Sequence, residues 1–76
     1  RLNKNQFNGE IPITIGNLIN LERVYFSNNY FSGTIPISIC DLGLSQLHYF
    51  ANYLCSPYPD SNCAGNIEGH QQSCIP

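Results

Sequence analysis

The sequence predicts a solenoid, a fold in which short coils of chain stack on one another around a shared hydrophobic core. Three observations predict it. The segment at residues 29–39 repeats the segment at residues 5–15 with a shift of 24 positions, and a period of about 20 to 50 residues is typical of stacked repeats. Short alternating apolar stretches precede each copy, and all four cysteines lie from residue 40 onward. One coil cannot bury its apolar stripe alone, so the coils must stack.

Residues 1–20 are predicted to form a partial first repeat. They contain the end of a strand, Phe7, a bend at Gly9 and a short apolar return segment. Phe7 recurs as Phe31, and we expect both rings to belong to a buried spine. Because Arg1 falls within a strand pattern whose beginning is missing, we expect the chain to be the C-terminal end of a longer array.

Residues 21–43 are predicted to form the one full repeat. Val24 and Phe26 alternate with Tyr25 and Ser27, which is the period of a short, half-buried strand. We therefore expect Val24 and Phe26 to point into the core, and Tyr25 and Ser27 to point outward.

The rest of this repeat predicts a turn and a short return. The Asn29 side chain closes the strand and is expected to bond to backbone groups of the turn and of the neighbouring coil. Gly33 permits a tight bend. Pro36 fixes its own φ and has no backbone N–H, at a position where no strand hydrogen bond is expected to need one. Residues 37–42 form an apolar return that is too short for a full α-helix.

Residues 44–59 are predicted to form a last, irregular repeat, and residues 60–76 a C-terminal cap. Asn29 and Asn52 are separated by 23 positions, so one residue has been lost near residues 41–43. With that shift, Tyr58 and Pro59 align with Ile35 and Pro36. After Pro59 the pattern is expected to dissolve into a polar tail that covers the open edge of the array.

Residues 21–36 resemble the plant-type leucine-rich repeat, whose motif is LxxLxLxxNxLxGxIP. The resemblance implies a leucine-rich repeat solenoid: a right-handed β/3-10 superhelix with short parallel strands on its concave face and a disulfide-stapled C-terminal cap. Similar repeats form the ectodomains of plant receptor kinases and the polygalacturonase-inhibiting proteins. An extracellular location, either secreted or on a cell surface, is implied as well.

The four cysteines favour disulfides over a zinc site, because no CxxC spacing occurs among Cys40, Cys55, Cys63 and Cys74. Residues 52–63 are similar to the NxLCGxPLxxC ending of plant-type caps, which favours Cys55–Cys63 and leaves Cys40–Cys74. A register argument competes with this pairing. Cys63 follows Cys40 by 23 positions, and stacked strands lie about 4.8 Å apart, close enough for a bridge. We prefer the first pairing.

Composition argues against several functions. The net charge is −2 and 11% of the residues are charged, so the chain has no electrostatic footprint for nucleic acid or an anionic membrane. No apolar run is long enough to span a membrane. No catalytic set, cofactor motif or metal-spaced cluster occurs, and pairing His48 with Cys55 as base and nucleophile is outweighed by a structural role for each. We predict a non-enzymatic protein without cofactor or metal.

The predicted binding surface is the concave strand face. Its candidate residues lie between or just beyond the inward apolar positions, and they are Arg23, Tyr25, Ser27, His48 and Phe50. Exposed aromatic groups fit a protein, peptide or glycan ligand, although Phe50 equally fits a role in sealing the cap. The alternative function is a structural building block of a surface layer or fibre, which self-stacks through its open N-terminal edge.

Overall fold

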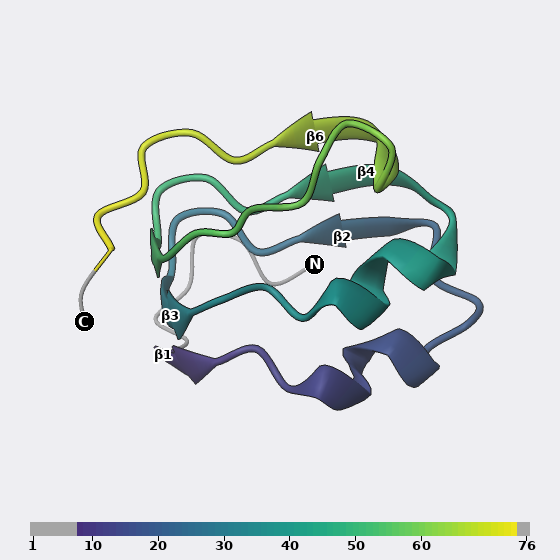
Figure 1. Cartoon of the computed structure of the whole chain (residues 1–76), viewed down its shortest axis with the longest axis horizontal. Helices are drawn as coiled ribbons and strands as arrows, with labels where there is room; N and C mark the ends of the chain where they lie inside the picture. Colours follow the sequence, from purple (N-terminus) through teal and green to yellow (C-terminus); the bar gives the residue numbers. More distant parts are fainter. Residues whose placement is uncertain (1–7, 75–76) are drawn as a thin grey trace.

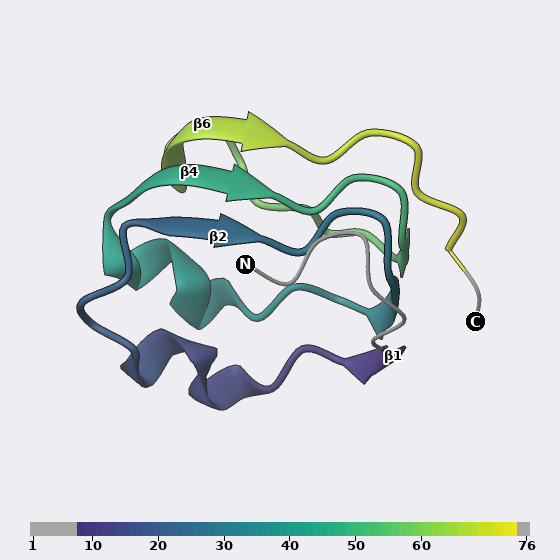
Figure 2. The same ribbon diagram turned by 180° about the vertical axis from the view of Figure 1, so that it is seen from behind.

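The computed structural model describes residues 8–74, which form two three-stranded parallel sheets and two short 3-10 helices. The first sheet contains β1 (Asn8–Glu10), β3 (Tyr30–Gly33) and β5 (Tyr53–Leu54); the second contains β2 (Arg23–Tyr25), β4 (Leu44–His48) and β6 (Ala64–Glu68). The helices are η1 (Ile13–Asn17) and η2 (Ile37–Leu42). The chain runs through these elements in successive coils, and each coil is called a pass below. The passes lie one above another in both views of the ribbon (Figures 1 and 2).

Each strand pairs in parallel with a strand of the next pass, by steps of 23 and then 20 residues in the second sheet and of 22 and then 21 in the first. In the second sheet Arg23 pairs with Gln46 and Tyr25 with His48, a step of 23 residues that confirms the predicted loss of one residue between the two repeats. In the first sheet Gly9 pairs with Phe31. Two sheets of stacked parallel strands are what a repeat fold requires, since each strand finds its partner only in the next pass.

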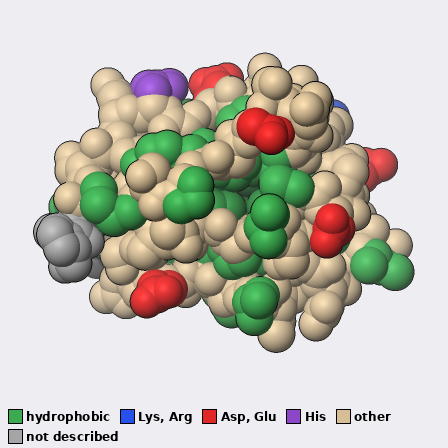
Figure 3. Space-filling view, viewed as in Figure 1, with side chains coloured by type: hydrophobic (Ala, Val, Ile, Leu, Met, Phe, Trp, Pro, Cys, Tyr) green, Lys and Arg blue, Asp and Glu red, His purple; other side chains and the backbone are tan. Residues whose placement is uncertain are grey.

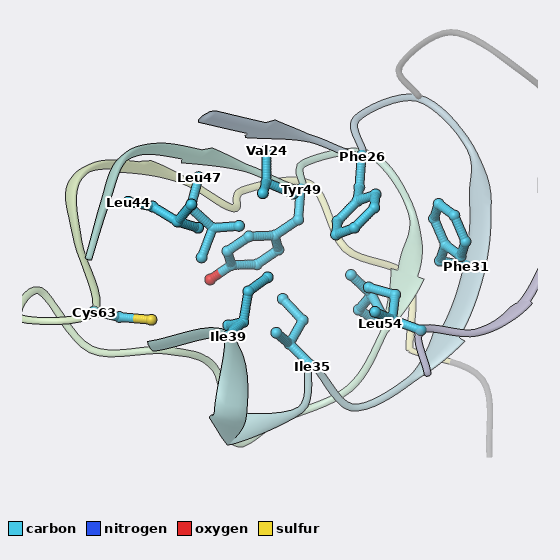
Figure 4. Close-up of a cluster of buried hydrophobic side chains, with 11 residues drawn as sticks. Val24, Phe26, Phe31, Ile35, Ile39, Leu44, Leu47, Tyr49, Leu54 and Cys63 are labelled. Atoms are coloured by element: carbon cyan, nitrogen blue, oxygen red, sulfur yellow. The ribbon is translucent and has the colours of Figure 1, made fainter. Parts of the chain in front are cut away.

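The core lies between the second sheet and the return segments (Figure 4). Val24 and Phe26 are buried, as their alternation predicted. Ile39, Leu47 and Leu54 come from three different elements and are fully buried. The ring of Phe31 is also buried, which confirms its predicted place in the spine, whereas Phe7 lies outside the described residues.

Asparagine side chains link the passes through backbone carbonyls. Asn29 Nδ2 donates to the carbonyl oxygens of Phe26 and Ser27 at 2.9 and 3.1 Å. Asn52 Nδ2 donates to Tyr49 O at 3.0 Å within its own pass and to Phe26 O at 2.9 Å in the pass below. The predicted bonding of Asn29 to its own turn is therefore confirmed, and the bond to a neighbouring pass is made by the equivalent residue Asn52.

The repeat pattern does not dissolve after Pro59, so that expectation was wrong. Strand β6 adds a third strand to the second sheet, with Leu47 opposite Ile67. Gln72 then takes the place of the ladder asparagine: its Nε2 donates to Tyr49 O at 2.6 Å and to Gly69 O at 3.3 Å, and its Oε1 accepts from Leu54 N at 3.1 Å. A glutamine supplies the same amide group as an asparagine, so the last pass is bonded like the others.

The preferred disulfide pairing was also wrong. Cys40 is bonded to Cys63, with their Cα atoms 4.5 Å apart, and Cys55 to Cys74, at 4.7 Å. The reason is the path of the loop after β5. It crosses the return side of the molecule, where Pro57 lines the same hollow as Cys40 and Cys63. Cys55 is left at the end of β5 and meets the segment that follows β6, so the register argument gave the correct bridge.

Candidate functional site

The candidate site lies on the outer face of the β2-β4-β6 sheet, at the strand ends and just beyond. Parallel register brings Tyr25, His48 and Glu68 side by side, one from each strand. A second row contains Arg23, Gln46 and Asn66. Side chains on one face of neighbouring strands lie about 5 Å apart, so a ligand that meets one strand also meets the next.

Four rings form a continuous aromatic row on this face: Tyr25, His48, Phe50 and His70. The Tyr25 and His48 ring centroids lie 5.0 Å apart in an edge-to-face contact. His48 and Phe50 are 6.4 Å apart, and His70 stacks on Phe50 at 4.8 Å with only 7° between the ring planes. Such contacts restrict ring motion, which lowers the entropy cost of binding.

Polar groups complete the site around the imidazole of His48. His48 Nε2 lies 3.0 Å from Asn66 Oδ1, within hydrogen-bond distance for an N–H that donates to the amide oxygen. Glu68 Oε2 lies 3.7 Å from the same nitrogen, so protonation of the imidazole makes this contact an ion pair. The Tyr25 hydroxyl donates to Gln46 Oε1. The surface therefore combines ring faces with both donors and acceptors.

The backbone beneath the row is regular. Parallel bonding continues beyond the strands, where Phe26 N donates to His48 O at 2.7 Å and Tyr49 N donates to Glu68 O at 2.8 Å. Asn28, Ala51 and Gln71 follow in equivalent positions and share a left-handed conformation, with φ of 59°, 57° and 60°. Every pass therefore turns in the same way at this position.

The structure brings four of the five predicted binding residues to this face. Arg23 is exposed, and Tyr25, His48 and Phe50 are half-buried. Ser27 was predicted wrongly: only 3% of it is exposed, and its Oγ has no hydrogen-bond partner within the part of the chain that the structure describes. β2 ends at Tyr25, and the turn that Asn29 holds through the Ser27 carbonyl ends the alternation of inward and outward side chains.

Three further residues of the site, Asn66, Glu68 and His70, were missed. They come from the last pass, which was predicted to lack the repeat pattern. The signal was present in weakened form. Residues 44, 47, 49 and 52 carry Leu, Leu, Tyr and Asn, and residues 64, 67, 69 and 72, each 20 positions later, carry Ala, Ile, Gly and Gln. Ala64 and Gly69 replace bulky residues, and Ile67 and Gln72 replace a leucine and an asparagine, so a search for the repeat's leucines and asparagine does not find this pass.

All the cysteines of the described residues are disulfide-bonded. Cys55 is held in a disulfide and so offers no thiol to His48. Within residues 8–74, no group of three or more His, Cys, Asp or Glu side chains is placed to hold a metal ion. None of the helices in this range has the length and apolar character needed to cross a membrane. Both disulfides are compatible with an oxidising, extracellular environment.

Comparison with known families bears on residues 20–42, which match the model of the Leucine Rich Repeat family. The match supports a leucine-rich repeat protein. It covers the pass from the end of the first return segment to the end of η2, including β2 and β3. Neither the curated proteins nor the solved structures gave a match to the chain. Leucine-rich repeats generally mediate protein interactions, which fits a recognition module.

Proposed function

We propose that this protein is a non-enzymatic recognition module that binds a protein or peptide partner on the outer face of the β2-β4-β6 sheet. The observation that carries the proposal is the aromatic row, in which Tyr25, His48 and Phe50 touch in sequence while remaining partly exposed. Aromatic residues dominate the energetics of protein interfaces. Rings that are already ordered before binding contribute most of their contact energy to affinity.

The polar groups around the row supply direction. Arg23 provides a cation and Glu68 a carboxylate on the same face, and both are exposed. Charges at the rim of an interface orient a partner and exclude those with the wrong charge pattern. A protein or peptide carries apolar and charged groups together, so it complements this surface better than a neutral glycan does.

Three finer assignments belong to the same proposal. The 24-residue spacing supports a plant-type leucine-rich repeat, the two disulfides support an extracellular location, and the cover that β6 provides over β4 supports a C-terminal cap in residues 60–76. Stacked repeats need such a covered end to remain soluble.

The test is a selection of displayed peptides on the oxidised protein, followed by measurement of each peptide against single-residue variants. We expect Tyr25→Ala and His48→Ala to weaken most selected peptides by about tenfold or more, the range for interface hot spots. Tyr30→Ala is the matched control, because Tyr30 is 48% exposed on the other sheet. The selected peptides should bind the Tyr30→Ala variant with the same affinity as the unaltered protein.

Two results would count against the proposal. One is a set of peptides that Tyr30→Ala weakens and Tyr25→Ala does not. The other is a loss of affinity in Tyr25→Ala and His48→Ala that is accompanied by a matching loss of thermal stability. The two side chains would then stabilise the fold and not contact the ligand. Concentration-dependent polymers in size-exclusion chromatography would favour the building-block alternative.

A further inference from the structure

A second surface lies on the opposite side of the core, where the return segments pass one above another. We call this surface the return face, and its centre is formed by Ile13, Ile37, Pro57 and Tyr58. Ile13 is 74% exposed, Ile37 86% and Tyr58 40%. Figure 3 shows hydrophobic side chains gathered over the middle of this side of the molecule. A gathering of exposed apolar side chains on so small a protein marks an interaction site.

The return face is shaped by the fold and not by one loop alone. Ile13 and Ile37 begin η1 and η2, which are stacked in successive passes, and Ser38 Oγ donates to Ile13 O at 3.0 Å across the two helices. The Cys40–Cys63 bridge holds the next pass beside them. Between η2 and the 57–60 loop lies a hollow of about 270 Å³, lined by Ile37, Pro59 and Asp60 among others. A protruding apolar side chain of a partner fits such a hollow.

Carboxylates border this apolar surface, and within residues 8–74 no Lys or Arg side chain does. Asp60 lines the hollow itself, and Asp41 lies on η2. Glu10 is the last residue of β1, and its side chain lies against Gly33 of the neighbouring strand β3. All three residues are exposed, and Figure 3 shows acidic side chains spaced around the hydrophobic ones. Arg23 is the one Lys or Arg within residues 8–74, and it belongs to β2 on the other face.

This charge pattern selects among possible occupants. A second copy of the chain would bring carboxylates against carboxylates, since the protein carries a net charge of −2. An anionic membrane surface would repel the same groups. A partner segment with an apolar stripe flanked by Lys or Arg satisfies both parts of the surface at once. We propose that the return face docks a basic amphipathic segment of a partner protein.

The proposal does not depend on the proposed function, because the two surfaces share no residue. The probe is a synthetic amphipathic peptide of Leu and Lys, about four helical turns long, labelled for fluorescence anisotropy. Its counterpart has the same Leu pattern with Glu in place of every Lys. We expect the Lys peptide to bind, and the Glu peptide to bind at least about tenfold more weakly. The difference should shrink as salt is added, because exposed charges are screened.

Single substitutions locate the contact. Ile37→Ser should weaken the Lys peptide about fivefold or more, the loss expected when a few buried methylene groups are removed from an interface. Asp60→Asn should weaken it about threefold and reduce its salt dependence. Ile19→Ser is the matched control, because Ile19 is 79% exposed but lines a different hollow at the end of η1. All three substitutions alter exposed side chains, so the fold should be retained.

Four results would overturn the proposal. The Lys peptide does not bind, it binds as well as the Glu peptide, Ile37→Ser leaves its affinity unchanged, or Tyr25→Ala weakens it as much as Ile37→Ser does. The last result would assign the peptide to the aromatic row and would support the proposed function instead. Vesicles of anionic phospholipid form a separate arm, and binding that Ile37→Ser abolishes there would replace the protein partner with a lipid surface.

Discussion

The ring of Tyr49 fills the space into which a side chain at Gly69 would project. A β-carbon built on Gly69 would lie 2.1 Å from Cζ of Tyr49 and 2.4 Å from its hydroxyl oxygen. The two residues occupy equivalent positions in successive passes, since Tyr49 follows His48 and Gly69 follows its partner Glu68. The last pass therefore contributes no core side chain at this position, and the ring from the pass below closes the core in its place.

Gly69→Ala should lower the free energy of unfolding by about 1 to 3 kcal/mol, the usual cost of inserting a methyl group into a packed core. Urea unfolding of the single variants and of the double variant with Tyr49→Leu measures the effect. Because leucine leaves the space open, the cost of Gly69→Ala should be much smaller in the Tyr49→Leu background. Equal costs in both backgrounds would show that the ring is not the obstacle.

Gln72→Ala should destabilise the protein by about 1 to 3 kcal/mol, because it leaves the N–H of Leu54 without its amide acceptor and removes one of the two amide donors to the carbonyl of Tyr49. Gln71→Ala is the matched control. Gln71 is exposed and keeps the same left-handed backbone in either form, so its change should stay within about 0.5 kcal/mol. Chemical denaturation of the three proteins distinguishes a ladder residue from a surface glutamine.

Proteolysis without reductant should recover the Cys40–Cys63 and Cys55–Cys74 bridges. Cleavage before Asp41 and Asp60 and after Glu68 places every cysteine in a different fragment, so mass spectrometry assigns each bridge directly. Recovery of fragment 41–59 linked to fragment 60–68 would refute this connectivity. Removing the Cys40–Cys63 bridge by a double Ser substitution should cost about 3 kcal/mol for a loop of this length.

Stability should fall in alkaline solution through the ionisation of Tyr49. Burial, with a smaller contribution from Tyr58, raises the pKa of the Tyr49 hydroxyl above its ordinary value of 10.0. The folded state therefore holds this proton more tightly than the unfolded state, and its contribution is present below pH 10 and is lost as the pH rises through the raised pKa. Urea unfolding across this range should show a shallower decline for Tyr49→Phe, and an unchanged one for Tyr30→Phe.

Much of the fold was predictable because strand alternation and the 24-residue repeat are direct consequences of burial. The burial of Val24, Phe26 and Phe31 and the turn bonds of Asn29 follow from that pattern and were predicted correctly. The last pass was not predicted, because its residues differ in type from those of the earlier passes and are recognisable only from the contacts that they make in the fold. Gly69 is a core position filled by another residue's ring, and Gln72 replaces an asparagine with a longer side chain that reaches the same atoms.

The candidate site was predictable to the same extent. Tyr25, His48 and Phe50 could be placed together because a parallel register needs only one shift of 23 residues. Ser27 could not, since its burial depends on where β2 ends and how tightly Asn29 holds the following turn. The return face was also beyond the pattern, because Ile13 and Ile37 look like core residues until the path of the 3-10 helices is known.

The Cys55–Cys74 bridge also determines how the molecule would respond to tension. A pull applied beyond residue 74 passes through the bridge to Cys55 at the end of β5. From there the shortest covalent path to Cys40 runs along residues 56–63 and through the Cys40–Cys63 bridge, so residues 64–73, which include β6, lie outside it. The hydrogen bonds that join β6 to β4 would then stay unloaded until the bridge is reduced. A reductant would thus change which strand yields first under force, with no change in the sequence.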